Sequence, residues 1–238
     1  EEIVFDDGSK LTVTEIFELP MIGTTGDDAI DGTSHSETIS ALSGDDTINS
    51  GSGNDIINAG QGHDIINAEN GNDTVDGGEG DDTITANGAG SNTLLGGDGD
   101  DILRINRSTN YSYQRDYASK ATNTLSGGAG NDRLEGSSGA ETYVFNKGDG
   151  QDTINDFDED ARNVTYSWNK TDKIALGNGI VKDDLSIQRS GNHLVILIGG
   201  ADSGDSITIE NMYSDSRYRI EEIVFDDGSK LTVTEIFE

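Results

Sequence analysis

Residues 77–85 read GGEGDDTIT. The glycines permit the positive φ angles of a tight turn, and residues 83–85 form a very short strand with Ile84 facing inward. One apolar residue in nine cannot build a core alone, so such units must stack on one another. Asp82 and the turn carbonyls supply hard oxygen ligands, which suit Ca²⁺ better than a transition metal. The stretch therefore predicts a stacked turn-and-strand unit that binds calcium.

The same nine-residue spacing extends in both directions from this unit. Units begin at residues 23, 32, 41, 50, 59 and 68 before it and near residues 87, 96, 127, 136 and 147 after it. A parallel β-helix without calcium and a disordered Gly/Asp-rich linker are the alternatives, but a linker does not keep an apolar residue at a fixed period. The inward position is filled by Ile30, Ile39, Ile48, Ile57, Ile66, Val75, Ile84, Leu94, Leu103, Leu134, Tyr143 and Ile154.

The sixth position of each unit carries the candidate metal carboxylate. Glu37 and Glu141 replace aspartate there, Asn92 replaces it in the degenerate unit near residue 87, and His35 stands where the fourth-position glycine belongs. We expect weaker or missing sites at these units. The remaining sixth positions are Asp28, Asp46, Asp55, Asp64, Asp73, Asp82, Asp101, Asp132 and Asp152.

The pattern G-G-x-G-x-D-x-U-x, where U is a large apolar residue, resembles the calcium-binding repeat of RTX (repeats-in-toxin) proteins. The resemblance implies an all-β fold, a parallel β-roll of stacked nonapeptide turns in which two nonapeptides make one coil. Each Ca²⁺ would lie between turns eighteen residues apart, held by carbonyls two and four of one turn, carbonyls one and three of the next, and both sixth-position carboxylates. One implied site combines Gly60, Gly62 and Asp64 with Gly77, Glu79 and Asp82, and another combines Gly51, Gly53 and Asp55 with Ala68, Asn70 and Asp73. Further candidate ligands in these turns are Gly26, Gly44, Ala59, Gln61, Gly71, Gly78, Gly80, Gly96, Gly97, Asp98, Gly99, Gly127, Gly128, Ala129 and Gly130.

The charge of the chain supports a cation partner. The 238 residues include 46 acidic and 15 basic side chains, for a net charge of −31. This charge argues against nucleic acid and anionic membranes as partners, and no apolar run is long enough to cross a bilayer. About eight Ca²⁺ ions would neutralise roughly half of it, so we expect folding and metal binding to be one event. The chain has no cysteine, which leaves calcium as the staple of an extracellular protein.

Residues 1–18 and 221–238 are both EEIVFDDGSKLTVTEIFE. We interpret residues 19–238 as one repeating unit and residues 1–18 as the tail of a preceding copy, which would make neighbouring copies partners of this one. An engineered duplication that caps the roll is the alternative. Whether residues 1–18 pack on the roll stays open at this stage.

Residues 105–120 interrupt the repeat and are expected to form a loop inserted in the roll, which spans residues 19–156. The loop is rich in aromatic and basic residues, notably Tyr111, Tyr113, Arg115 and Tyr117. One hypothesis is a contact site for a host glycan or receptor. The alternative is a loop that packs its tyrosines on the roll.

Residues 157–238 are expected to form a β-rich cap, which resembles the haemolysin-type calcium-binding related region of RTX proteins. Strands are predicted at residues 184–189, 193–198, 206–210, 219–225 and 230–233, the first two forming a hairpin around Gly191. Before them, Asp156, Asp158 and Asp160 show acidic spacing that lacks the glycine and glutamate of an EF-hand, and indicate either a separate calcium loop or a solvated acidic turn.

No catalytic constellation is recognisable, because His35, His63 and His193 have neither a nucleophile motif nor zinc-ligand spacing. We therefore expect a non-enzymatic, calcium-binding structural module. The resemblance implies type I secretion, folding outside the cell or at the bacterial surface, and a stalk role in an adhesin. The alternatives are a receptor- or glycan-binding module of an RTX toxin and an accessory module of an extracellular enzyme.

Overall fold

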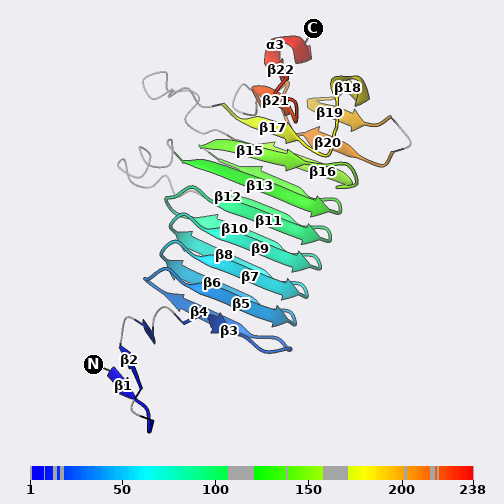
Figure 1. Ribbon diagram of the computed structural model, residues 1–238. Coiled ribbons are helices and arrows are strands. Elements are labelled where there is room, and N and C mark those ends of the chain that lie inside the picture. The colour runs from blue at the N-terminus through cyan, green and yellow to red at the C-terminus, as the bar shows by residue number, and fades with distance from the viewer. Residues whose placement is uncertain are drawn as a thin grey trace.

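A computed structural model describes residues 2–7, 9–12, 15–16, 19–106, 121–137, 139–157, 171–200, 203–214, 218 and 220–237. Two ten-stranded sheets face each other along the length of the molecule, and the chain alternates between them in successive coils (Figure 1). The expected all-β fold, a parallel β-roll, is confirmed by this arrangement. In the described residues no helix is long and apolar enough to cross a membrane.

The first sheet collects every second strand of the roll and ends in the cap. Its roll strands pair in parallel, with Ile48 opposite Ile66 and Ile84 opposite Leu103. In order across the sheet the strands are β4 (Ala29–Thr33), β6 (Thr47–Ser52), β8 (Ile65–Asn70), β10 (Thr83–Asn87), β12 (Ile102–Asn106), β14 (Arg133–Gly136), β16 (Gln151–Asp156), β20 (Ser206–Ile209), β19 (His193–Ile198) and β18 (Leu185–Ser190).

The second sheet collects the strands in between. Ile57 lies opposite Val75 and Leu94 opposite Leu125, again in parallel register. In order the strands are β3 (Met21–Ile22), β5 (Thr38–Ser43), β7 (Ile56–Gln61), β9 (Thr74–Glu79), β11 (Thr93–Asp98), β13 (Thr122–Ala129), β15 (Ala140–Phe145), β17 (Lys173–Leu176), β21 (Glu222–Phe225) and β22 (Lys230–Thr232).

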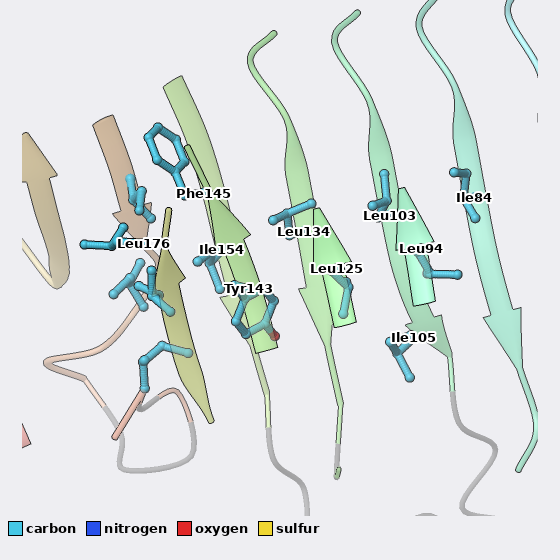
Figure 2. Packing of buried hydrophobic residues seen from close by; sticks show 14 of the residues in the cluster. Ile84, Leu94, Leu103, Ile105, Leu125, Leu134, Tyr143, Phe145, Ile154 and Leu176 are labelled. Carbon is cyan, nitrogen blue, oxygen red and sulfur yellow. The ribbon is translucent and has the colours of Figure 1, made fainter. Parts of the chain in front are cut away.

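The core is the space between the two sheets, and the predicted inward residues fill it. From Ile39 to Ile154 each of the predicted positions is buried, whereas Ile30 at the open end of the roll is only partly covered. Figure 2 shows these side chains projecting from successive strands into the interior, with Leu103, Leu134 and Ile154 in line. The nine-residue period therefore correctly placed the core.

The roll continues across the interruption in the repeat, because β11 pairs with β13 and β12 with β14. The inserted segment was expected to begin at residue 105, and this boundary is wrong by two residues. Ile105 and Asn106 belong to β12, and Ile105 is buried. Its side chain takes the inward position that alanine occupies in the preceding coils, so it contributes to the core.

The cap prolongs both sheets of the roll. β17 pairs in parallel with β15, and β20 pairs in parallel with β16, before the antiparallel strands β19 and β18 complete the first sheet. The strands predicted in this block are confirmed to within a few residues, including the hairpin of β18 and β19. The described residues of the cap also include a 3₁₀ turn at Lys182–Asp184 and the short helix α3 (Val233–Phe237).

The first residues form a separate hairpin. β1 (Glu2–Val4) and β2 (Lys10–Thr12) make a two-stranded antiparallel sheet of their own. Figure 1 places this hairpin at the opposite end of the molecule from the cap.

Candidate calcium sites

The sixth-position side chains preceding the first sheet form a continuous hydrogen-bonded column, here called the aspartate ladder. Each member's backbone N–H donates to the carboxylate of the member one coil further on. Asp46 donates to Asp64 Oδ1 at 2.7 Å, and Asp82 donates to Asp101 Oδ1 at 2.8 Å. The ladder consists of Asp28, Asp46, Asp64, Asp82, Asp101, Asp132 and Asp152.

A second column, the mixed ladder, precedes the strands of the second sheet. It includes neutral and longer side chains but keeps the same kind of bond, as where the Asp73 N–H donates to Asn92 Oδ1 at 2.9 Å. Between Asn123 and Glu141 the link is instead a side-chain bond, from Asn123 Nδ2 to Glu141 Oε1 at 2.8 Å. The ladder consists of Glu37, Asp55, Asp73, Asn92, Asn123, Glu141, Asp172 and Glu221.

Three members of the mixed ladder, Asn123, Asp172 and Glu221, escaped the sequence analysis. The Glu141 N–H donates to Asp172 Oδ1, and the Asp172 N–H donates to Glu221 Oε2, each at 2.8 Å. Asp172 and Glu221 stand two positions before a buried isoleucine, Ile174 or Ile223. That acid-x-apolar ending of the nonapeptide was the available signal.

In every ladder aspartate after Asp28, Oδ1 accepts the ladder hydrogen bond, and the surroundings of the other oxygen, Oδ2, show whether the ladder suits a metal ion. Burial of a charged oxygen without a partner is costly, so a carboxylate oxygen in this position is suited to bind a cation. Within the described residues these buried oxygens accept no hydrogen bond from the protein. They are the Oδ2 atoms of Asp46, Asp55, Asp64, Asp73, Asp82, Asp101 and Asp132.

Backbone carbonyl oxygens of the turns lie close to the Oδ2 atoms of the sixth-position aspartates. A side chain at Gly77 would collide with Asp82 Oδ2 and would come within 2.6 Å of the Gly96 carbonyl oxygen. At Gly23 a side chain would meet Asp28 Oδ2 at 2.7 Å and the Ala41 carbonyl at 2.6 Å. A sixth-position carboxylate and the first-position carbonyl of the next turn thus share one small space kept open by glycine. These hard oxygens fit Ca²⁺.

The second- and fourth-position glycines set how closely the coils stack. Gly78 and Gly80 have φ values of 112° and 121°, and a side chain on either would collide with the carbonyl of Gly60 or Gly62 one coil earlier. The same tight contact with an earlier coil and a positive φ recur at Gly44, Gly51, Gly53, Gly60, Gly62, Gly71, Gly97, Gly99, Gly128 and Gly130, whereas the space around Gly26 is open.

The third-position carbonyls are partly engaged within the protein. Gly62 N–H donates to the Glu79 carbonyl at 2.8 Å, and Gly53 N–H donates to the Asn70 carbonyl at 2.8 Å. A carbonyl oxygen has two lone pairs, so each keeps one acceptor position for a metal ion. The same bond is received by Gln61, Asp98 and Ala129. Of the first-position candidates, Ala59 and Ala68 are buried, and Gly77, Gly96 and Gly127 each lie against their own turn's aspartate.

Without a metal ion the ladder carboxylates resist ionisation. Burial raises the pKa of Asp82 and Asp132 to about 6 and that of Asp101 and Asp152 to about 8, against smaller lowering by the ladder hydrogen bonds. Burial also raises the pKa of Asp46, Asp64 and Asp73. A bound divalent cation would reverse this preference and hold the carboxylates ionised.

The replaced sixth positions stay in the mixed ladder with altered chemistry. The Glu37 carboxylate turns back to its own unit, accepting from the Thr33 N–H at 3.2 Å and from the Thr33 hydroxyl. Asn92 accepts the Asp73 N–H and donates its own N–H to Asn123 Oδ1 at 3.0 Å, but carries no charge. The expectation of weaker sites here stays a prediction, and its physical basis is the diverted carboxylate of Glu37 and the uncharged amide of Asn92.

Three acids form a group where the roll meets the cap. Carboxylate oxygens of Glu141, Asp156 and Asp172 lie within 4.8 Å of one another, and all three side chains are buried. Burial, followed by the charges of Asp156, Glu141 and Asp172, raises the pKa of Tyr143 well above its ordinary value. Asp156 therefore lies inside the roll rather than in the acidic loop or turn that its spacing suggested. Asp158 and Asp160 lie outside the described residues, as do Tyr111, Tyr113, Arg115 and Tyr117.

Comparison with known families agrees with this geometry. The family model of the RTX calcium-binding nonapeptide repeat (4 copies) matches residues 21–48, 31–66, 60–88, 88–104 and 117–154, which together exceed half of the chain. The chain belongs to the RTX repeat family. It is thus a calcium-binding RTX repeat module. A second model, the haemolysin-type calcium binding protein related domain, matches residues 193–235 of the cap.

Individual relatives are more distant. The RTX chain is 38% identical over 100 residues to the iron-regulated protein FrpA of Neisseria meningitidis serogroup C. That match covers 41% of this chain and spans 8% of the relative's length. Among solved structures, the extracellular lipase LipA from Serratia marcescens matches with a TM-score of 0.37 and 17% identity, over 80% of this chain and 37% of the lipase.

Proposed function

We propose that this RTX module is a calcium-folded spacer in a tandem array, acting as the stalk of a secreted bacterial adhesin. RTX repeat proteins are typically secreted, and extracellular calcium is roughly millimolar, within the range that binds extracellular modules. Seven buried Oδ2 atoms of ladder aspartates accept no hydrogen bond within the described residues, and they support a chain that needs this calcium in order to fold. Export by a type I system would precede folding.

The observation that carries the stalk role is the duplication of residues 1–18 at residues 221–238. The two copies lie at opposite ends of the roll (Figure 1). Modules joined through these segments can therefore follow one another in line instead of folding back, as in other elongated repeat proteins.

We also propose that the module is not an enzyme. His35 and His63 lie in separate repeat turns and His193 begins β19. Apart from Asp149, whose carboxylate accepts the Asn146 N–H at 2.7 Å, the buried acids of the described residues belong to the two ladders or to the Glu141–Asp156–Asp172 group. These placements support a structural role for the ionisable side chains.

The test is the length of a chain that carries two consecutive copies of residues 19–238. In millimolar calcium we expect the maximum dimension from small-angle X-ray scattering to be about twice that of the single module. A two-copy chain no longer than one module would contradict the stalk. Glycan-array binding that is lost in Tyr111→Ala and Tyr113→Ala would favour a binding module instead.

A further inference from the structure

Equivalent strands in the two copies of the eighteen-residue segment pair in the same way. Glu2 pairs with Thr12 and Val4 with Lys10, as Glu222 pairs with Thr232 and Val224 with Lys230. The same ion pair closes each hairpin, at 2.7 Å between Lys10 and Glu2 and 2.6 Å between Lys230 and Glu222. The local sequence therefore specifies the hairpin in either setting.

The surroundings of the two hairpins differ. In the C-terminal copy β21 lies beside β17 in parallel register, and Ile223 and Phe225 are 0% and 5% exposed. In the N-terminal copy the equivalent Ile3 and Phe5 are 49% and 46% exposed. The same apolar face is thus buried in one copy and open in the other.

The N-terminal hairpin has a free strand edge as well as an open apolar face. Among the described residues, β1 hydrogen-bonds only with β2. An exposed edge of this kind is a template for pairing with another strand. The edge known to accept this sequence is β17, which already holds β21 of its own chain and lies at the far end of the roll (Figure 1). A second copy of the chain is therefore the partner that fits.

We propose that residues 2–12 are a strand donor that docks on the β17 edge of a second copy, in the place and register of residues 222–232. The docked hairpin would set Glu2 opposite Lys173, Val4 opposite Ala175 and Phe5 opposite Leu176, as Glu222, Val224 and Phe225 are in one chain. The inference rests on the proposed array, in which residues 2–12 belong to the preceding copy. Its tests are separate, because they follow oligomers and cross-links of the 238-residue chain and not the length of a two-copy chain.

The hairpin at residues 2–12 of one copy and the hairpin at residues 222–232 of another compete for the same β17 edge. Because their sequences are identical, each would make the same contacts there. The C-terminal hairpin is tethered, with an effective concentration on the order of 1 mM, so at about 10 µM protein it wins by roughly a hundredfold. Docking from a second copy should therefore be a minor state of the 238-residue chain. It should become dominant when the C-terminal hairpin alone is weakened.

The first test uses full-length substitutions at matched positions. Phe225→Asp weakens the resident hairpin, Phe5→Asp weakens the donor, and the double variant weakens both. In calcium, light scattering after size-exclusion chromatography should show head-to-tail oligomers for Phe225→Asp, with association strengthened about a hundredfold. Phe5→Asp and the double variant should stay monomeric. An oligomerising double variant, or a folded Phe225→Asp chain that stays monomeric, would overturn the proposal.

Disulfide trapping tests the same contact with both hairpins intact, and the natural chain has no cysteine to interfere. Val4→Cys combined with Ala175→Cys should give covalent dimers and longer chains on mild oxidation. Val224→Cys with Ala175→Cys should close within one chain, following the observed register. Val4→Cys with Leu95→Cys, an exposed position on β11 of the same sheet, is the control for random collision. Equal cross-linking of Val4→Cys to positions 95 and 175 would reject the docking site.

Discussion

The two ladders share one backbone geometry and differ in charge. In the aspartate ladder every member is an aspartate, and five of its Oδ2 atoms are buried without a protein partner. Among the described aspartates of the mixed ladder, Asp55 and Asp73 have such an atom, and this ladder continues through the amides of Asn92 and Asn123. An amide satisfies the stacking hydrogen bond without bringing a charge into the interior. The comparison shows that the sixth-position side chain has two separable roles. It accepts the hydrogen bond that stacks neighbouring coils, and, where it is a carboxylate, it can also bind a metal ion.

Removal of calcium should have the largest effect, and should act most strongly through the aspartate ladder. In excess chelator at pH 7.5 we expect far-UV circular dichroism to show loss of the β-structure, since several ionised carboxylates would be buried together. Calcium should restore it cooperatively. Magnesium should not, because it demands octahedral geometry and gives up water reluctantly. A β-rich spectrum in chelator would contradict the central claim.

The next largest effect should come from neutralising one member of each ladder. Asp101→Asn keeps the ladder acceptor but removes a metal carboxylate, and we expect a loss of about 3 kcal/mol in urea unfolding at saturating calcium. Asp73→Asn, beside the neutral Asn92, should cost about 1 kcal/mol. Calorimetry should show fewer bound ions for Asp101→Asn. Equal losses for both variants would mean that the ladders do not differ in metal dependence.

The reverse substitution sharpens the comparison by adding charge to the mixed ladder. Asn92→Asp places a carboxylate in a buried site between Asp73 and Asn123. We expect the calcium midpoint of folding to rise, with a cost of about 1–3 kcal/mol at low calcium. At saturating calcium the cost should shrink or reverse as a further ion binds. A cost independent of calcium would show a packing defect instead.

The smallest effect should be that of pH on the aspartate ladder. In the metal-free fold Asp82 and Asp132 have pKa values of about 6 and Asp101 and Asp152 of about 8, above the ordinary value of 3.8. The folded chain then holds more protons than the unfolded chain, so its metal-free stability falls as pH rises from about 4 to about 8. Calcium needs the ionised forms, and its affinity should fall by less than about tenfold from pH 8 to pH 6.5.

The sequence predicted those features that depend on a fixed spacing. Ile48, Ile66 and Ile84 follow one another at the coil period, and the structure stacks them as expected. Asp172 lies 31 residues after Glu141, and Glu221 lies 49 residues after Asp172. Their place in the ladder therefore depends on which strands pair, and not on a fixed number of residues per coil. Strand pairing over such distances is decided by tertiary packing, which local patterns do not encode.

Asp156 shows a second limit of sequence patterns. It follows Ile154 by two residues and therefore faces inward on β16, where Ser50 and Ala68 stand in earlier coils. Gly136 lies opposite it and leaves the space that the Tyr143 hydroxyl and Asp156 occupy. The acidic spacing suggested a solvent-facing loop, whereas strand alternation placed the side chain in the core.

The stacking of coils also stores length. Hydrogen bonds between coils run along the axis of the roll, so one coil of about 18 residues adds only about 4.8 Å, whereas the same residues pulled straight span about 60 Å. Tension between the two ends of the molecule breaks these hydrogen bonds one coil at a time. Each ion held between neighbouring turns would resist the separation of two coils. A surface tether built in this way would lengthen by unfolding coils under load or in low calcium, and would shorten again as the coils refold when calcium returns.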